Sequence, residues 1–329
     1  MANSKSKKTT ASSSKKSTKA VKAQTAKTEA SVREDKEAKA EKNNKNEKAT
    51  FKSLMKGFFS KKYDTSETIL TIFSRPQIYG ALIGEIIGTM LLTMTIICLG
   101  MTNPLYIWFA MTAITVAVFG LSGANLNPLI TVGMMASRRM SAIRGVLYIL
   151  AQIIGAWLAM TLTSGFKGWA ESTADMPAIA EVADGNFWKV AIIELVGAIM
   201  IAFFFARAWK YRKSPLTFGL IVGTGFAVSI IYVYIISQSY FGLSNNYMMN
   251  PAIALMYQIL PSAGDNFGEI MGGILQALTI YAIFPMAGGV LGFYLSEFTS
   301  RLSGERQKYT LKYFAGDCCE CGDECNCKK

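Results

Sequence analysis

Long apolar runs fill the chain from Tyr79 onward, whereas residues 1–62 are almost entirely Lys, Ala, Ser, Thr, Glu and Asn. A helix that crosses a bilayer needs about 20 mostly apolar residues, and six segments meet that requirement. They lie at about 79–100, 105–121, 143–164, 187–206, 216–236 and 270–298. A soluble helical core could contain one such run, but hardly this series. The pattern therefore predicts an all-α membrane protein with six transmembrane helices.

The polar segment 1–62 carries too little apolar surface to offset the entropy of ordering, so we expect a disordered cytoplasmic tail. No apolar run follows its first basic residues, which argues against a signal peptide. Its lysines would attract anionic lipid headgroups, each by about 1 kcal/mol near a negative leaflet. Nucleic-acid binding is less favoured, because these lysines lack interleaved aromatic side chains for base stacking.

The loop charges predict the orientation, because Lys and Arg in short loops stay on the cytoplasmic side. Basic residues gather in the N-terminal tail, between spans two and three, between spans four and five, and after span six. The alternate connections are acidic at 165–186 and uncharged at 237–250. We therefore expect both termini in the cytoplasm and, for the location, the plasma membrane.

Two stretches of the chain resemble each other. Glu85 in the first span is followed, two spans later, by Asn127-Pro128-Leu129. Glu194 in the fourth span is followed in the same way by Asn250-Pro251-Ala252. Each half has an odd number of spans, so the two halves must face opposite ways in the membrane. In such inverted repeats the site lies near the midplane, where broken helices from both halves meet.

The Asn-Pro pairs suit the start of a helix, because Asn is a good N-cap and Pro is favoured at the first helical position. One such pair alone is more often a turn, but two at matching places are a stronger signal. The apolar residues after them are too few to span a bilayer, so each helix would enter and stop midway. Two helix N-termini meeting there would oppose cations and protons while letting neutral molecules pass.

Four motifs, in order, resemble the major intrinsic protein family, the aquaporins and glycerol facilitators. They are Ser122-Gly123-Ala124-Asn125-Leu126-Asn127-Pro128, Ala151-Gln152-Ile153-Ile154-Gly155-Ala156, Pro215-Leu216-Thr217-Phe218-Gly219-Leu220 and Met249-Asn250-Pro251-Ala252. The resemblance covers about residues 79–301. It implies an aquaporin-like inverted repeat of six helices plus two half-helices, usually a homotetramer with one pore per subunit. The channel domain would occupy residues 63–305, between the basic tail 1–62 and a Cys-rich tail 306–329.

The resemblance also implies roles for matching residues. Asn127 and Asn250 would donate hydrogen bonds to a solute at the pore centre, which the two Asn-Pro boxes would form. Glu85 and Glu194 would be buried and would accept hydrogen bonds from the half-helix loops. The physical argument supports the same burial. A carboxylate inside a membrane span is energetically costly, so it normally faces the bundle interior and has a partner. A place at the headgroup boundary is the alternative for either Glu.

Three departures from the family pattern affect which solutes we expect to pass through the pore. Leu129 stands where the first box normally has Ala, so the centre is expected to be tighter or rearranged. Ile253 stands where an Arg normally follows the second box, and the chain has no His at all, so the His of a water-selective constriction is missing. The family's outer constriction uses four positions. By spacing they fall at Ile107 (with Trp108 adjacent), Phe226, Tyr247 and Ile253.

That ring is apolar and aromatic and has no fixed positive charge. It suits the carbon face of a polyol better than a narrow polar ring would, and it could also dewet and close the pore. We therefore predict a passive channel for water or small uncharged solutes such as glycerol. A membrane scaffold that does not conduct, closed by Leu129 and the ring, is the alternative.

Five cysteines crowd the C-terminal tail: Cys318, Cys319, Cys321, Cys325 and Cys327. Thiolates this close would suit Zn²⁺ or Cu(I), although the spacing is not a pair of Cys-x-x-Cys motifs. A reduced cytoplasmic tail is not expected to hold disulfides. Palmitoylation or an unstructured thiol-rich tail are alternatives, and a channel gated by metal at this tail is a third functional hypothesis. No other cofactor is expected, and no nucleophile–base pair or phosphate loop points to an enzyme.

Overall fold

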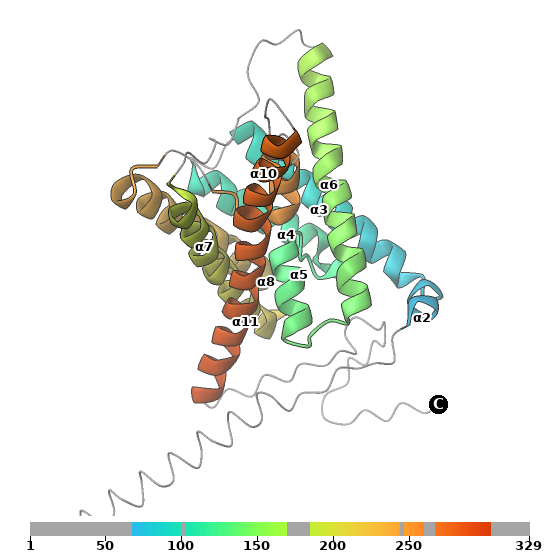
Figure 1. The fold of residues 1–329 in the computed structure, drawn as a ribbon. Coiled ribbons are helices and arrows are strands. Elements are labelled where there is room, and N and C mark those ends of the chain that lie inside the picture. Colours follow the sequence, from blue (N-terminus) through green and yellow to red (C-terminus); the bar gives the residue numbers. More distant parts are fainter. Residues whose placement is uncertain (1–67, 100–102, 170–184, 244–246, 260–266, 304–329) are drawn as a thin grey trace, which may run out of the picture. The chain divides into compact units, whose positions relative to one another are not determined.

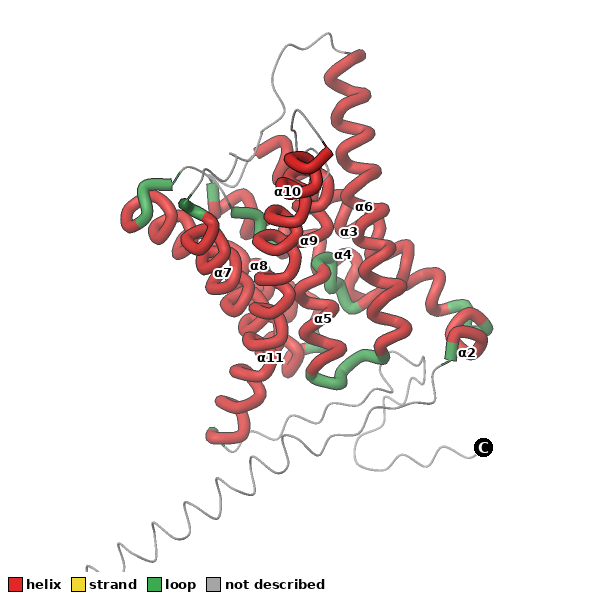
Figure 2. Tube along the Cα trace, viewed as in Figure 1, coloured by secondary structure: helices red, strands yellow, loops and turns green. Residues whose placement is uncertain are grey.

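The computed structural model describes residues 68–99, 103–169, 185–243, 247–259 and 267–303. These residues are almost all helical, and they contain no strand (Figures 1 and 2). All of them belong to one unit, residues 62–329. The predicted tails at 1–62 and 306–329, with the five C-terminal cysteines, lie outside the described residues.

Six helical segments are long and apolar enough to cross a membrane, which confirms the predicted fold class. They are α3 (Gln77–Leu99), α4 (Pro104–Ser122), α6 (Ala142–Trp169), α7 (Phe187–Ala208), α8 (Pro215–Ile235) and the pair α10 (Phe267–Leu278) with α11 (Phe284–Leu302). A short helix, α2 (Ile69–Phe73), precedes the first span, and one 3₁₀ turn, Trp209–Tyr211, follows α7.

Two short helices begin at the Asn-Pro pairs. They are α5 (Pro128–Ala136) and α9 (Pro251–Ala254), the latter continued by a π-helical turn, Leu255–Ile259. At a rise of 1.5 Å per residue, α5 is about 14 Å long, roughly half the apolar thickness of a bilayer. Figure 2 shows α5 lying among the longer helices. The predicted half-helices are therefore present.

The helices pair in the same way in both halves. In the first half α3 packs on α4 and α6, and in the second half α7 packs on α8 and α11. The halves meet where α4 lies against α8. Each half-helix also contacts the third span of the other half, α5 against α11 and α9 against α6. This exchange brings the starts of α5 and α9 together in the interior.

The second half contains three π-helical turns, whereas the described helices of the first half contain none. π-helical turns occupy Ile236–Tyr240, Leu255–Ile259 and Thr279–Ile283. The last of these divides the sixth span, which the sequence pattern presents as one run. Pro285 lies two residues after this turn and cannot donate a backbone hydrogen bond to it, so a regular helix is interrupted there.

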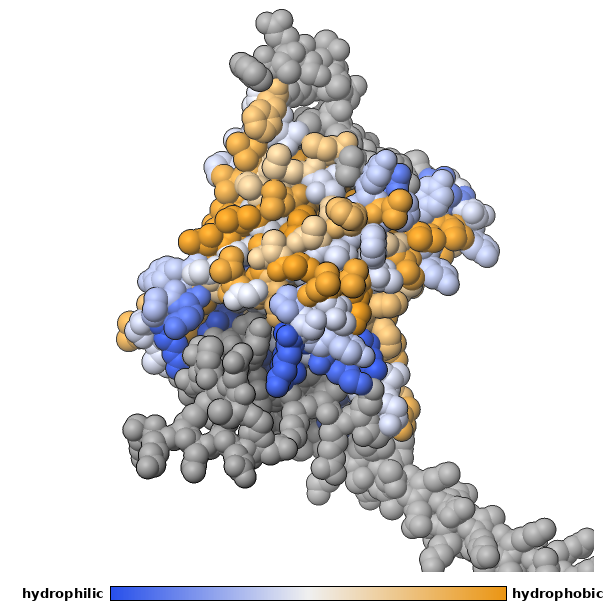
Figure 3. Space-filling view, turned by 180° about the vertical axis from the view of Figure 1, so that it is seen from behind, coloured by the Kyte–Doolittle hydropathy of each residue, from blue (hydrophilic) through white to orange (hydrophobic). Residues whose placement is uncertain are grey.

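Large apolar side chains face outward around the spans, and polar side chains face inward. Phe109 and Trp188 are 69% and 66% exposed, whereas Glu85, Glu194 and Asn127 are fully buried. Figure 3 shows hydrophobic residues forming a broad band on one face, with hydrophilic residues below it. A protein in water rarely exposes such a continuous apolar surface, so this distribution fits a chain surrounded by lipid.

Candidate functional site

The carboxylate of Glu85, on α3, holds the backbone that leads into α5. Its two oxygens accept hydrogen bonds from the backbone N–H groups of Asn125 at 3.0 Å and Leu126 at 2.8 Å. The Gln152 amide of α6 donates a third bond at 2.7 Å. A carboxylate is the natural acceptor for two adjacent N–H groups, because each oxygen takes one. Glu85 thus fixes the loop before the first half-helix from inside the bundle.

Glu194, on α7, occupies the equivalent place in the second half. It is fully buried, and its two oxygens accept hydrogen bonds from the backbone N–H groups of Met248 and, at 2.9 Å, Met249. The backbone leading into α9 is therefore fixed by the same chemistry as the backbone leading into α5. Both carboxylates lie in the interior of the bundle.

The residue before each Asn has a backbone conformation that is unusual for a residue other than glycine. Leu126 has a φ of 56° and Met249 a φ of 50°, in the left-handed region. Each side chain fills space left open by a glycine one turn beyond the Glu. A Cβ at Gly88 would overlap Cδ2 of Leu126, and one at Gly197 would overlap Sδ of Met249.

A Glu-x-x-Gly pattern therefore recurs in both halves. The Glu binds two backbone N–H groups, and the Gly admits the side chain of the residue before the Asn. The sequence contains both copies, Glu85-Ile86-Ile87-Gly88 and Glu194-Leu195-Val196-Gly197. The sequence analysis identified the Glu residues but not the steric role of the glycines. The repeated Glu-x-x-Gly spacing could have indicated that role.

The Asn residues cap the two half-helices. Oδ1 of Asn127 accepts a hydrogen bond from the Leu129 N–H at 3.0 Å, and Oδ1 of Asn250 accepts one from the Ala252 N–H at 3.1 Å. Pro128 and Pro251 take the first helical positions, where no backbone donor is needed. Both Asn-Pro pairs thus start helices rather than simple turns.

The same two side chains also join the halves. Nδ2 of Asn127 donates to the backbone carbonyl of Met249 at 2.8 Å, and Nδ2 of Asn250 donates to that of Leu126 at 3.2 Å. An amide nitrogen carries two hydrogens, so each Asn keeps one further N–H. The N-terminal ends of α5 and α9, each with partial positive charge, therefore meet with one amide hydrogen on either side that no described residue accepts.

Leu129 lies on the side of α5 that faces α11. Its backbone lies against Gly289 of α11, and Gly133, one turn further along α5, faces Phe293. Residues four apart share a face of a helix. The leucine in the first box is thus fully buried at a contact between two helices. Ala252, its counterpart in the second box, is buried against α6 beside Ala156.

The four positions predicted to form the outer constriction are all buried. Ile107, Phe226, Tyr247 and Ile253 belong to the main hydrophobic cluster. Trp108, next to Ile107 on α4, donates from Nε1 to Oγ1 of Thr224 on α8 at 3.1 Å. Thr224 is two residues before Phe226, so Ile107 and Phe226 lie at similar heights along the two helices. Trp108 is thus directed at α8. Sequence reasoning did not identify Thr224 as its partner.

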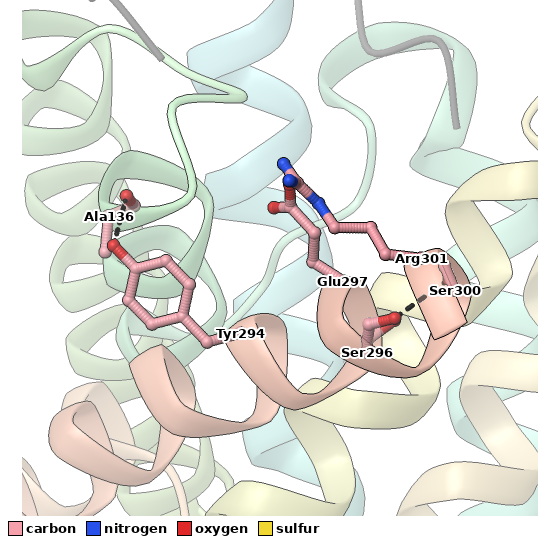
Figure 4. Close-up of polar contacts among 6 residues, drawn as sticks. All are labelled: Ala136, Tyr294, Ser296, Glu297, Ser300 and Arg301. Carbon is pink, nitrogen blue, oxygen red and sulfur yellow. Dashed lines mark hydrogen bonds and ion pairs between the residues drawn. The ribbon is translucent and has the colours of Figure 1, made fainter. Parts of the chain in front are cut away.

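One polar contact ties α11 to the far end of α5, and further polar contacts lie within α11 itself (Figure 4). The Tyr294 hydroxyl donates to the backbone carbonyl of Ala136 at 3.0 Å. One helical turn beyond, the carboxylate of Glu297 pairs with the guanidinium of Arg301 at 2.7 Å. The Tyr294 bond holds the C-terminal end of the first half-helix, and the Glu297–Arg301 pair lies within α11. Within the described residues, no group of three or more His, Cys, Asp or Glu is arranged to bind a metal.

Comparison with known proteins adds the following. The sequence model of the family described as "Major intrinsic protein" matches residues 72–295. Aquaporin TIP1-2 of Musa acuminata is 26% identical over 176 residues, which are 50% of this chain and 64% of that protein. Aquaporin-1 of Pongo abelii is 28% identical over 211 residues, which are 58% of this chain and 69% of that protein. The chain thus spans about two thirds of the length of these relatives.

Among solved structures, the X-ray structure of the aquaglyceroporin from Plasmodium falciparum is similar. The likeness covers 68% of this chain and 95% of that one, at 16% sequence identity and a TM-score of 0.47.

Proposed function

Because this chain belongs to the major intrinsic protein family, we propose that it is a passive channel for water and small uncharged solutes such as glycerol. The observation that carries the proposal is the reciprocal pair of Asn side chains where α5 and α9 begin. Each amide donates one hydrogen to a backbone carbonyl of the opposite loop, and its second hydrogen is not accepted by a described residue. A neutral solute at that point can accept hydrogen bonds from both sides without any conformational change.

The same arrangement discriminates against cations. The ends of two helices contribute partial positive charge at one place, and Glu85 and Glu194 are turned away from it toward backbone N–H groups. A cation there would lose its hydration shell and gain no negative partner. A neutral molecule loses only hydrogen bonds that the amides replace.

The proposed outer constriction consists of Ile107, Phe226, Tyr247 and Ile253. Three of these four side chains have no polar atom, and no guanidinium or imidazole is present. Apolar walls suit the carbon backbone of a polyol, so the proposal extends to glycerol as well as water. The relatives named above are aquaporins, and the similar solved structure is titled an aquaglyceroporin.

Stopped-flow light scattering on proteoliposomes tests this function. The full chain should relax an osmotic water gradient and a glycerol gradient faster than empty vesicles do. The double variant Asn127→Leu, Asn250→Leu should reduce both rates to those of empty vesicles. Asn186→Leu is the matched control, because Asn186 stands at the N-terminus of α7 without a side-chain capping bond. If both gradients relax no faster with the unmodified chain than in empty vesicles, the channel proposal is refuted and the scaffold hypothesis remains.

The orientation and assembly follow from the same proposal. Arg138, Arg144, Arg207 and Arg301 lie at or beyond the helix ends that border the connections expected inside the cell, which supports cytoplasmic termini. The plasma membrane is the location that we propose. The exposed apolar faces of the spans would contact lipid and, in a homotetramer, neighbouring subunits. Cross-linking in liposomes measures the assembly, and protease access to tags at either terminus measures the orientation.

The two tails carry separate proposals. The Lys-rich segment 1–62 would bind anionic headgroups, and its removal should weaken sedimentation with vesicles that contain phosphatidylserine. The five C-terminal cysteines would bind Zn²⁺ or Cu(I) and gate the channel. Metal titration that changes neither the glycerol flux nor the reactivity of these thiols would exclude that gate.

A further inference from the structure

Three buried oxygen atoms around Glu85 have no hydrogen-bond partner among the described residues. They are Oγ1 of Thr89 on α3, Oδ1 of Asn125 in the loop before α5, and Oε1 of Gln152 on α6. Each atom exposes less than 1 Å², and each of the three residues is 0% exposed. A polar atom buried without a partner is costly, so three of them around one carboxylate require an explanation.

Two of these oxygens belong to side-chain amides that share their partners. The backbone N–H of Asn125 and the amide of Gln152 both donate to the Glu85 carboxylate, at 3.0 and 2.7 Å. The amide nitrogens of Asn125 and Gln152 also both donate to Oγ1 of Thr131, at 3.3 and 2.9 Å. The oxygen and nitrogen of an amide are bonded to the same carbon. Both unpaired amide oxygens therefore lie close to Thr131.

Turning either amide over would not supply the missing donor. The Thr131 hydroxyl donates its one hydrogen to the Asn127 carbonyl at 3.2 Å, so it can only accept from the two amides. An oxygen of Asn125 in place of the nitrogen would face the lone pairs of that hydroxyl. An oxygen of Gln152 in place of its nitrogen would also face the Glu85 carboxylate. The amide orientations are thus determined, and they leave two acceptors for a further donor.

The Thr89 hydroxyl is a group of the complementary kind. Thr93 and Thr95, on the same helix, donate to the carbonyls four residues earlier, at 2.7 and 2.9 Å. Thr89 makes no such bond within the described structure, so its hydrogen remains available. A Cβ on Gly155 would lie 3.1 Å from the Cβ of Thr89, and Gly155 is about one turn along α6 from Gln152. The hydroxyl therefore lies at the same contact of α3 and α6 as the unpaired Gln152 oxygen.

We propose that these three groups bind one buried water molecule between α3, α6 and the loop before α5. The water would donate one hydrogen to Oδ1 of Asn125 and the other to Oε1 of Gln152, and it would accept the hydrogen of Thr89. A buried water usually makes about three hydrogen bonds to groups that otherwise lack partners. The set needs a molecule with two donors and one acceptor, and water is the smallest that has them.

This water would join the loop before α5 to two spans in the first half of the chain. Asn125 stands two residues before Asn127, and Met248 stands two residues before Asn250. A methionine offers no amide oxygen, so the second half has no counterpart of this acceptor. The site is separate from the proposed passage of solutes, and its test does not depend on whether the chain conducts.

A crystal structure of the full chain that shows ordered water molecules tests the proposal directly. We expect one peak of density at hydrogen-bond distance, about 2.7–3.2 Å, from the Thr89, Asn125 and Gln152 oxygens. Well-ordered side chains without density between them would overturn the proposal. A peak that contacts only one of the three would overturn it as well.

The variant Thr89→Val gives a second measurement, because it removes the hydroxyl and keeps the branched shape. If the hydroxyl donates to a bound water, the thermal midpoint in detergent should fall by about 2–4 °C, the effect of one neutral hydrogen bond. A hydroxyl buried without any partner gives the opposite sign, because its removal is neutral or stabilising. A midpoint equal to or above that of the unmodified chain would therefore contradict the proposal.

Thr112→Val is the matched control. Oγ1 of Thr112, on α4, is also buried without a described partner, but it lies where a Cβ on Gly223 of α8 would overlap it. Its midpoint should not fall. An equal fall in Thr112→Val and Thr89→Val would overturn the proposal, because the loss would then follow from replacing any buried threonine and not from this site.

Discussion

Gln152 donates an amide hydrogen to the carboxylate of Glu85 at 2.7 Å, and Glu194, its counterpart, receives no such bond from a described side chain. The nitrogen of Gln152 also donates to Oγ1 of Thr131 in α5 at 2.9 Å. The first loop is therefore fixed to three helices, α3, α5 and α6. The second loop depends on α7 and on the Asn pair, and the three π-helical turns all lie in that half.

This asymmetry predicts unequal costs for two isosteric variants. In Glu85→Gln and in Glu194→Gln, one backbone N–H loses an oxygen acceptor, and hydrogen bonds to a charged group contribute about 1.5–3 kcal/mol. In Glu85→Gln the new amide can donate to Gln152 after that side chain turns over. In Glu194→Gln no described side-chain donor to the carboxylate is present that could turn over in this way, since the partners of Glu194 are the backbone N–H groups of Met248 and Met249.

We therefore expect Glu194→Gln to lower the free energy of unfolding by about 3 kcal/mol, and Glu85→Gln by about 1 kcal/mol less. Thermal unfolding in detergent measures both. Glu269→Gln, at an exposed carboxylate in the first turn of α10, is the control and should cost less than about 1 kcal/mol. Equal midpoints for the two buried variants would contradict the asymmetry.

Asn127 has two separable tasks, capping α5 and bonding the opposite loop. Ser is a good N-cap but is too short to reach the Met249 carbonyl, and Ala performs neither task. Asn127→Ser should therefore cost about 1 kcal/mol and Asn127→Ala about 2 kcal/mol of stability. The order of the two thermal midpoints checks this. Equal midpoints would show that the cap contributes nothing here.

Gly88 leaves the space that Leu126 fills, so a methyl group there should disturb the first loop. Overpacking of this kind usually costs about 1–3 kcal/mol. Gly80 lies on the same helix with open space around it. Gly80→Ala should be neutral or stabilising by about 0.5–1 kcal/mol, because Gly is a poor helix former. We expect Gly88→Ala to lower both the thermal midpoint and glycerol permeability, and a midpoint equal to that of Gly80→Ala would contradict the packing argument.

Tyr294 bonds the last turn of α5 from α11. Tyr294→Phe removes that bond and leaves the Ala136 carbonyl without it, which should cost about 1 kcal/mol of stability. The ratio of glycerol to water permeability should not change, since the contact lies at the far end of the half-helix. Measuring both quantities on Tyr294→Phe distinguishes a structural hydroxyl from one that contacts solute.

Much of the fold could be predicted because it depends on local properties of the chain. Apolar runs of sufficient length predict the spans, and Asn followed by Pro predicts a capped helix start. The matching order of Glu and Asn-Pro in both halves predicts the inverted repeat. Short-range backbone chemistry determines each of these features. The structure therefore differs from the sequence-based expectation mainly in detail, for example at the π-helical turn Thr279–Ile283 before Pro285 in the sixth span.

The site's contacts could not be predicted in the same way. Asn127 and Met249 are 122 residues apart in the chain, and Asn250 and Leu126 are 124 apart. Nothing in their local sequence indicates that each Asn bonds the loop of the other half. The sequence by itself determined six spans and two capped half-helices, and it predicts a largely apolar set of constriction residues. Only the tertiary structure decided that the caps also join the halves and that Leu129 faces α11. Those relationships arise when the two halves pack against each other, and side-chain neighbours across that contact are not encoded in any one segment.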